Sequence, residues 1–314
     1  MNISAEGLIF EISNNEIYIT GHTDRHNVKN IVIPSQIDGY PVTNIDDCAF
    51  ANCKNLTNAT ISNGVINIGR YVFTECFKLT NIILPNGLRN IYEGAFSNCI
   101  NLADVIIPDS VIYIDDCAFM NCTSLKSVTI PDKVKAIRED VFENCSNLIN
   151  VVIGNGVESI GYRAFSDCGK LTNVIIGGNV RSICKYAFLN CTSLTKLVIP
   201  NRVIFVDDNA LKGCSNIGQI IIGASITDIS FLNFVKNNLD WIGVDVNNHK
   251  YISADGVLCG YFGKSIQLLQ YPLARKYSRY IVPRDILYIK NSAFEGAKYL
   301  DDIIFLNEHS EWVD

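Results

Sequence analysis

The chain has 314 residues, of which 48% are hydrophobic and 18% are charged, and its formal net charge at pH 7 is −6. The charged share lies below the roughly 25% that is typical of globular domains, so the apolar content suffices for a core and excludes intrinsic disorder. The negative net charge argues against a general nucleic-acid binder, which needs an excess of Lys and Arg to neutralise phosphates.

Residues 1–41 precede the regular part of the sequence and are predicted to form an N-terminal cap. Residues 10–19 alternate as a capping hairpin would, and Ile31-Val32-Ile33-Pro34 is typical of a strand. A terminal repeat needs an atypical cap, because its core would otherwise lie open to water. The first seven residues lack the basic start and apolar run of a secretory signal, and no apolar run is long enough to predict a membrane span.

Residues 42–244 consist of one unit that recurs every 23 residues. Each unit has an aromatic or aliphatic marker, in most units followed three residues later by Cys and three residues after that by Leu or Ile. The markers are Phe50, Phe73, Phe96, Phe119, Phe142, Phe165, Phe188, Leu211 and Phe234, and the cysteines are Cys53, Cys76, Cys99, Cys122, Cys145, Cys168, Cys191 and Cys214. A β-branched run such as Val128-Thr129-Ile130-Pro131 follows, in which apolar residues alternate as in a short strand.

Such a unit is too short to bury an apolar face alone, so its copies must stack to form a core. Parallel strands lie about 4.8 Å apart, and about ten coils would therefore form a solenoid roughly 48 Å long. Each core side chain would contact its own copy in the next coil. The predicted fold is a repeat solenoid with a parallel β-sheet, short strands and turns.

The unit resembles the repeat of BspA-like proteins, the 23-residue (Treponema pallidum-type) class of leucine-rich repeats. The segment Cys122-Thr123-Ser124-Leu125-Lys126-Ser127-Val128-Thr129-Ile130-Pro131 nearly matches the repeat phrase of that family. The resemblance implies a non-enzymatic, adhesin-like protein that is secreted or lies at a cell surface and binds a host or bacterial surface protein. A cytoplasmic location stays open, because the chain itself shows no signal peptide.

The cysteines of the repeat are interpreted as a column of buried thiols. Neighbouring copies would have Cα atoms about 5 Å apart, within disulfide range, but their side chains point the same way and lack the Cβ geometry for a bridge. Cys48 and Cys117 share another position, three coils apart, and at about 4.8 Å per coil they are too distant to pair. No Cys-x-x-Cys pair indicates a zinc or redox site.

The sequence predicts no catalytic residues, no metal site and no cofactor. No Gly-rich phosphate loop occurs, and no Ser or Cys nucleophile lies near a plausible base. His22 and His26 have the i, i+4 spacing that holds a metal on a helix, but residues 21–26 are typical of a turn.

The outward positions of the repeated strand form the first candidate binding surface. In Val-x-Ile the middle residue points outward, which gives a mainly aliphatic column and, beside it, a polar column. The aliphatic column comprises Thr60, Ile83, Ile106, Thr129, Val152, Ile175, Val198 and Ile221, and the polar column comprises Asn58, Asn81, Asp104, Ser127, Asn150, Asn173, Lys196 and Gln219. An exposed apolar stripe with a polar border is typical of a protein-binding sheet. The alternative is that β-branched residues occur there only because they favour strands.

Residues 245–279 interrupt the repeat and are predicted to form an inserted hairpin. Segment 245–290 carries seven basic residues against three acidic ones, interleaved with tyrosines. Its candidate binding residues are Tyr261, Tyr271, Arg275, Lys276 and Arg279, which would contact a glycan or an acidic partner. The alternative is a structural hairpin that packs its tyrosines against the flank of the solenoid.

Residues 280–314 are predicted to be a last repeat and the C-terminal end. Tyr280-Ile281-Val282-Pro283 matches the strand run, and Ile286, Ile289 and Phe294 follow at the expected spacing. A third hypothesis for the whole chain is a structural spacer without a specific ligand.

Overall fold

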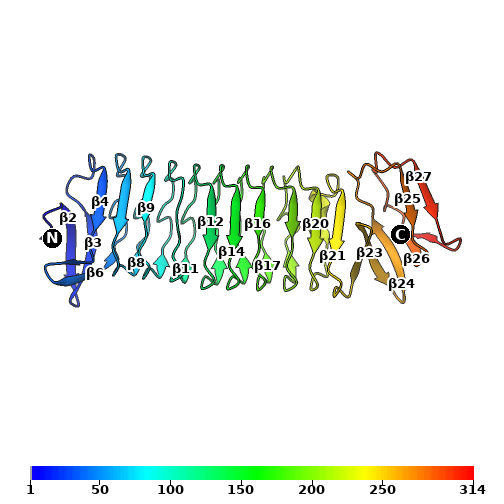
Figure 1. The fold of residues 1–314 in the computed structure, drawn as a ribbon, viewed down its shortest axis with the longest axis horizontal. Coiled ribbons are helices and arrows are strands. Elements are labelled where there is room, and N and C mark those ends of the chain that lie inside the picture. Colours follow the sequence, from blue (N-terminus) through cyan, green and yellow to red (C-terminus); the bar gives the residue numbers. More distant parts are fainter. Residues whose placement is uncertain (1) are drawn as a thin grey trace.

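A computed structural model describes residues 2–314 as one elongated β-solenoid, with the chain termini at opposite ends (Figure 1). The predicted leucine-rich repeat solenoid is confirmed, with coils of about 23 residues. Each regular coil contributes one strand to each of two sheets that run along the solenoid. Within residues 2–314, no helical segment has the length and apolarity that crossing a membrane requires.

The first sheet contains the β-branched runs, because alternating apolar residues place one side on the core. Its strands are β4 (Asn30–Ile33), β7 (Asn58–Ile61), β9 (Asn81–Ile83), β12 (Ser127–Ile130), β14 (Asn150–Ile153), β16 (Asn173–Ile175), β18 (Lys196–Val198), β20 (Gln219–Ile222) and β21 (Trp241–Val244). Paired strands are parallel, and equivalent residues of successive coils face each other, as Asn150 faces Asn173. The outward side of this sheet is called the strand face below.

The second sheet consists of shorter strands. They are β6 (Tyr40–Ile45), β8 (Asn67–Ile68), β10 (Asn90–Ile91), β11 (Tyr113–Ile114), β13 (Ala136–Ile137), β15 (Ser159–Ile160), β17 (Ser182–Ile183) and β19 (Phe205–Val206). The ladders of both sheets are interrupted, since residues 102–108 form no strand and β11 is not paired with β13. The first sheet is therefore divided into the blocks β4-β7-β9, β12-β14-β16 and β18-β20-β21.

The core is a set of ladders of identical side chains. The phenylalanines from Phe50 to Phe188 stack with ring centroids 5.1–5.5 Å apart. All eight repeat cysteines are buried, which confirms the predicted thiol column. Seven of them donate Sγ–H to the Phe carbonyl of the preceding coil, as Cys99 does to Phe73 at 3.1 Å. Burial raises the pKa of the Cys122 thiol to about 12.

The ninth marker departs from the predicted frame. Phe234 is exposed, whereas Phe231 is fully buried in the core. The reason is a 3-10 helix, η1 (Ser230–Phe234), which turns Phe231 and Leu232 inward instead. The sequence prediction for Phe234 is therefore wrong, although the period itself continues to β21.

The N-terminal end is closed by an antiparallel sheet of β1 (Asn2–Ile3), β2 (Leu8–Ser13) and β3 (Glu16–His22). β3 pairs in parallel with β6, which carries the sheet into the first coil. The strand β5 (Gln36–Ile37) pairs antiparallel with β6. Leu8, Phe10, Ile17 and Ile19 are buried and extend the core into this hairpin.

The insertion forms a three-stranded antiparallel sheet of β22 (Tyr251–Ala254), β23 (Val257–Phe262) and β24 (Ser265–Gln270). β24 continues in parallel to β26 (Ile286–Lys290) and β28 (Glu311–Val313), while β25 (Arg279–Val282) pairs with β27 (Asp302–Phe305). This part of the chain, called the C-terminal body below, has its own small core around Tyr271 and Tyr280.

Candidate functional site

The aliphatic column lies on the strand face as predicted. In β12, Val128 and Ile130 are buried while Thr129 is exposed, and the same alternation recurs in β9 and β18. Five of its eight members are exposed, and Thr60, Val152 and Ile221 are half-buried. Within residues 2–314, no segment of the chain covers this column fully, so its methyl groups meet water.

The structure extends the column by one residue that sequence analysis missed. Val32 on β4 faces Thr60 on β7 and is 58% exposed. The spacing between these two residues is 28 instead of 23, which hid Val32 from a fixed-period comparison. Its signal was the strand-like run around it. At the other end Ile221 faces Gly243, where the column stops.

Two hollows lie along the column. One of about 330 Å³ is lined by Ile83, Ile106 and Pro108 among others, and Ile106, at 85% exposure, stands out beside it. The other, of about 490 Å³, lies at the ends of β12, β14 and β16, where Gly154 and Gly177 take positions that other coils give to Pro. Glycine is required there, because a Cβ on Gly177 would lie 2.3 Å from the Gly154 carbonyl oxygen.

The polar column lies beside the aliphatic column and faces solvent. Asn58 is half-buried and donates from Nδ2 to Asn30 Oδ1 at 2.8 Å. Within residues 2–314, the side chains of the other seven members make no hydrogen bond to another part of the chain; these are Asn81, Asp104, Ser127, Asn150, Asn173, Lys196 and Gln219. Their donors and acceptors are available to a ligand, as a border of an interface requires.

The second candidate surface is only partly formed. Tyr271 is fully buried, packed against Tyr280 and Phe294, and Arg275 is 5% exposed. The expectation that these two residues line a binding surface is therefore wrong. The physical reason is that the aromatic rings build the small core of the C-terminal body, as the alternative interpretation of a structural hairpin predicted.

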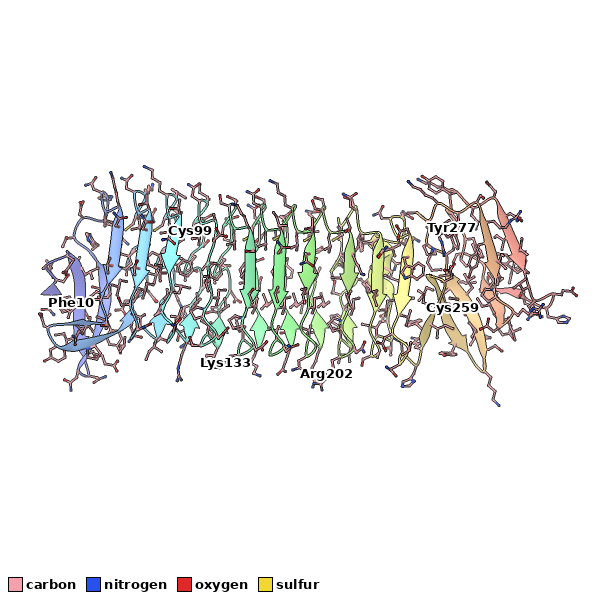
Figure 2. The ribbon with its side chains drawn as sticks, viewed as in Figure 1. Phe10, Cys99, Lys133, Arg202, Cys259 and Tyr277 are labelled. Carbon is pink, nitrogen blue, oxygen red and sulfur yellow. The ribbon has the colours of Figure 1, made fainter. Side chains whose placement is uncertain are left out.

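Arg275 serves as a joint between the C-terminal body and the end of the preceding stack. Its Nη2 bonds Asp255 Oδ2 at 2.7 Å, and its guanidinium carbon lies 4.4 Å from the Tyr277 ring centroid and 5.9 Å from that of Trp241. Tyr277 is at the rim of this body (Figure 2). Gly256 packs on the Trp241 ring, where a Cβ would lie 2.4 Å from the nearest ring atom.

The remaining members of this surface are exposed but dispersed over different segments. Tyr261 lies on β23, Lys276 in the loop after Arg275, and Arg279 on β25. Arg279 already bonds Asp302 Oδ2 at 3.0 Å. The predicted five-residue basic and aromatic surface thus loses two members to the core and part of a third to an internal ion pair.

Comparison with known proteins agrees with the observed repeat. The family described as "BspA type Leucine rich repeat region" matches in six copies, over residues 15–149 and 113–240. No curated protein matches the chain at a significant level.

Solved structures from gut and oral or pathogenic bacteria share the fold. A leucine rich cell surface protein of Faecalibacterium prausnitzii is 24% identical with a TM-score of 0.56, and the match covers 100% of this chain and 76% of that one. The Treponema pallidum leucine-rich repeat protein is 27% identical with a TM-score of 0.55, covering 69% and 91%. A leucine-rich repeat protein of Bacteroides ovatus is 19% identical with a TM-score of 0.56, covering 99% and 90%. The chain belongs to the BspA-type leucine-rich repeat family.

Proposed function

We propose that the chain is a non-enzymatic binding module that recognises a partner protein through its strand face, at a cell surface or after secretion. The observation that carries the proposal is the exposed aliphatic column with its solvent-facing polar border. The similar Faecalibacterium prausnitzii structure is of a cell surface protein, which supports the location.

The dimensions of the strand face suit a protein partner. Nine rungs from Val32 to Ile221 at about 4.8 Å per step span about 38 Å. A strip of that length needs a width of only about 20 Å to reach the roughly 800 Å² that each partner buries in a standard interface. Removal of one exposed Ile side chain from water contributes about 1.5–3 kcal/mol, so a few rungs supply a useful part of the binding free energy.

The test replaces outward residues of the aliphatic column. Ile106→Asp and Ile175→Asp place carboxylates where a partner would bury methyl groups, and binding should be lost because an unpaired charge would be desolvated. Binding is measured by surface plasmon resonance against a panel of purified host matrix proteins and bacterial surface proteins. The melting temperature should stay nearly unchanged, because both side chains already face water.

The matched control is Ile204→Asp. Ile204 is 59% exposed but lies just before β19, away from the aliphatic column. It should retain full binding. A panel without any partner would support a structural spacer, and equal loss of binding in the control would locate the binding surface elsewhere.

A further inference from the structure

The border of the strand face at the start of the strands carries a row of lysines. In the nine coils from β4 to β20, the five residues that end with the polar column contain only one acidic side chain, Asp104. The lysines at these positions are all exposed and are called the lysine row: Lys29, Lys54, Lys78, Lys126, Lys170 and Lys196. This border is therefore strongly positive in a chain whose net charge is −6.

The lysine row is not neutralised by the chain itself. Within residues 2–314, every ion pair is made by an Arg and none by these lysines. Lys78 and Lys170 donate from Nζ to the neutral amides Asn55 Oδ1 and Asn147 Oδ1, at 2.8 and 2.7 Å. Such contacts hold the ammonium groups along the border and leave their charge uncompensated.

The negative charge of the chain lies on a different part of each coil. The turns that follow the second-sheet strands, at positions 46–52 and every 23 residues up to 207–213, carry twelve acidic and five basic side chains. Arg138 and Arg163 pair there with neighbouring carboxylates, including Asp116 and Glu143. Each coil thus has a basic strand-face border and an acidic turn, which gives the surface a fixed electrostatic direction.

The two edges of the strand face also differ. The lysine row begins one residue after the repeat cysteines, at the edge where Cys99 lies, whereas Lys133 and Arg202 lie at the opposite edge (Figure 2). At that opposite edge Asp109 and Asp132 line the hollows together with Lys133. The excess of positive charge is therefore on one side of the aliphatic column only.

We infer that the partner of the strand face is an acidic protein segment with interspersed aliphatic side chains. This inference rests on the proposed function, since it names the chemistry of the partner for the same surface. The aliphatic column contacts the apolar side chains of the segment, and the lysine row pairs with its carboxylates. Charge complementarity of this kind selects the partner and sets its orientation.

The probe for the test is a fluorescein-labelled peptide of alternating Glu and Leu, and its binding is followed by fluorescence anisotropy at low and high salt. The row variant Lys126→Glu/Lys170→Glu/Lys196→Glu should bind roughly tenfold more weakly than the unmodified chain, because three attractive contacts become repulsive. Raising the salt concentration should remove most of that difference.

The matched control Lys135→Glu/Lys185→Glu/Lys212→Glu changes the net charge equally at exposed positions outside the strand face. It should bind within about twofold of the unmodified chain. Equal weakening of both triple variants would overturn the inference, since net charge alone would then explain it. No binding of the probe at low salt would overturn it as well.

The apolar variants separate this inference from the proposed function. If Ile106→Asp and Ile175→Asp abolish binding to a partner protein while the row variant leaves it unchanged, the strand face is the binding surface but its partner is not acidic. If the row variant loses the probe while both Ile variants keep it, acidic binding occurs without the aliphatic column, and both statements fail. Circular dichroism on every variant verifies that it is folded.

Discussion

The regular stack and the C-terminal body pack their aromatic side chains in different ways. In the stack, each Phe lies on its own copy with ring planes within 4–14° of parallel. In the C-terminal body, Tyr271 meets Tyr280 at 62° and Phe294 at 36°. Translation by one coil forces identical residues together, whereas the hairpin brings unrelated ones into contact. Packing is therefore dictated by the sequence period in the stack and by individual fit in the C-terminal body.

The largest expected effect is alkaline unfolding of the stack through its thiol column. Burial raises the thiol pKa above the ordinary value of 9.0, to about 12 for Cys122. The stabilisation is fully present below about pH 9, where the unfolded thiols are also protonated, and is lost as the pH rises toward the folded-state pKa. Each such thiol lowers the free energy of unfolding by about 1.4 kcal/mol per pH unit in that window. Urea unfolding between pH 8 and 11 measures the slope.

A double variant isolates the thiols from the tyrosines and lysines that titrate in the same range. Cys122→Ala/Cys145→Ala removes two fully buried thiols, so its stability should fall less steeply with pH than that of the unmodified chain. An identical slope would show that the thiol column does not control alkaline unfolding. The same column explains thiol labelling: only Cys48, Cys117 and Cys184 are not buried, so three of the twelve should react in the folded state.

The second effect concerns the Phe ladder. Phe119→Ala removes a ring that lies 5.1 Å from Phe96 and 5.4 Å from Phe142, and the cavity should lower the free energy of unfolding by about 3–5 kcal/mol. Phe234→Ala, at the exposed ninth marker, should cost less than about 1 kcal/mol. Urea denaturation followed by circular dichroism compares the two. Similar costs would restore Phe234 to the core and contradict its observed exposure.

The same contrast explains what sequence reasoning could predict. The Phe and Cys ladders and the exposure of Ile106 followed from the period, because one correct assignment applies to every copy. Val32 was missed because the first coil is five residues longer, so its neighbour Thr60 lies outside the period. Phe231 was missed because the 3-10 helix changes which side chain points inward without changing the spacing of the markers.

In the C-terminal body, the sequence shows composition but no period. Tyr271 and Arg275 looked like members of an exposed basic and aromatic surface because nothing in their spacing separates a buried tyrosine from an exposed one. Their placement depends on contacts such as that of Arg275 with Trp241, which lies 34 residues earlier in the chain. The lysine row, in contrast, could be found from the sequence once the strand face was known.

A smaller effect is expected at the joint between the two regions. Arg275→Ala removes the bond to Asp255 and the stacking on Tyr277 and Trp241, and should cost about 1–2 kcal/mol. The loss should concentrate in the C-terminal body, so amide exchange should accelerate in β22–β24 and stay unchanged in β12–β16. Lys276→Ala, at the exposed neighbour, should change stability by less than about 0.5 kcal/mol. Uniformly faster exchange along the chain would show that the two regions unfold together.

The smallest effect distinguishes the two regions by its sign. The hydroxyl of Tyr271 is buried without a hydrogen-bond partner among residues 2–314, so Tyr271→Phe keeps the ring and removes a desolvated polar group. The free energy of unfolding should stay equal or rise by up to about 1 kcal/mol. In the stack, Tyr113 donates from its hydroxyl to Asp115 Oδ1 at 2.8 Å, and Tyr113→Phe should lower stability by about 0.5–1.5 kcal/mol. Thermal unfolding of both variants under one buffer condition gives the comparison. A destabilised Tyr271→Phe would mean that the hydroxyl has a partner, such as a buried water, and that the core of the C-terminal body is more polar than its side chains indicate.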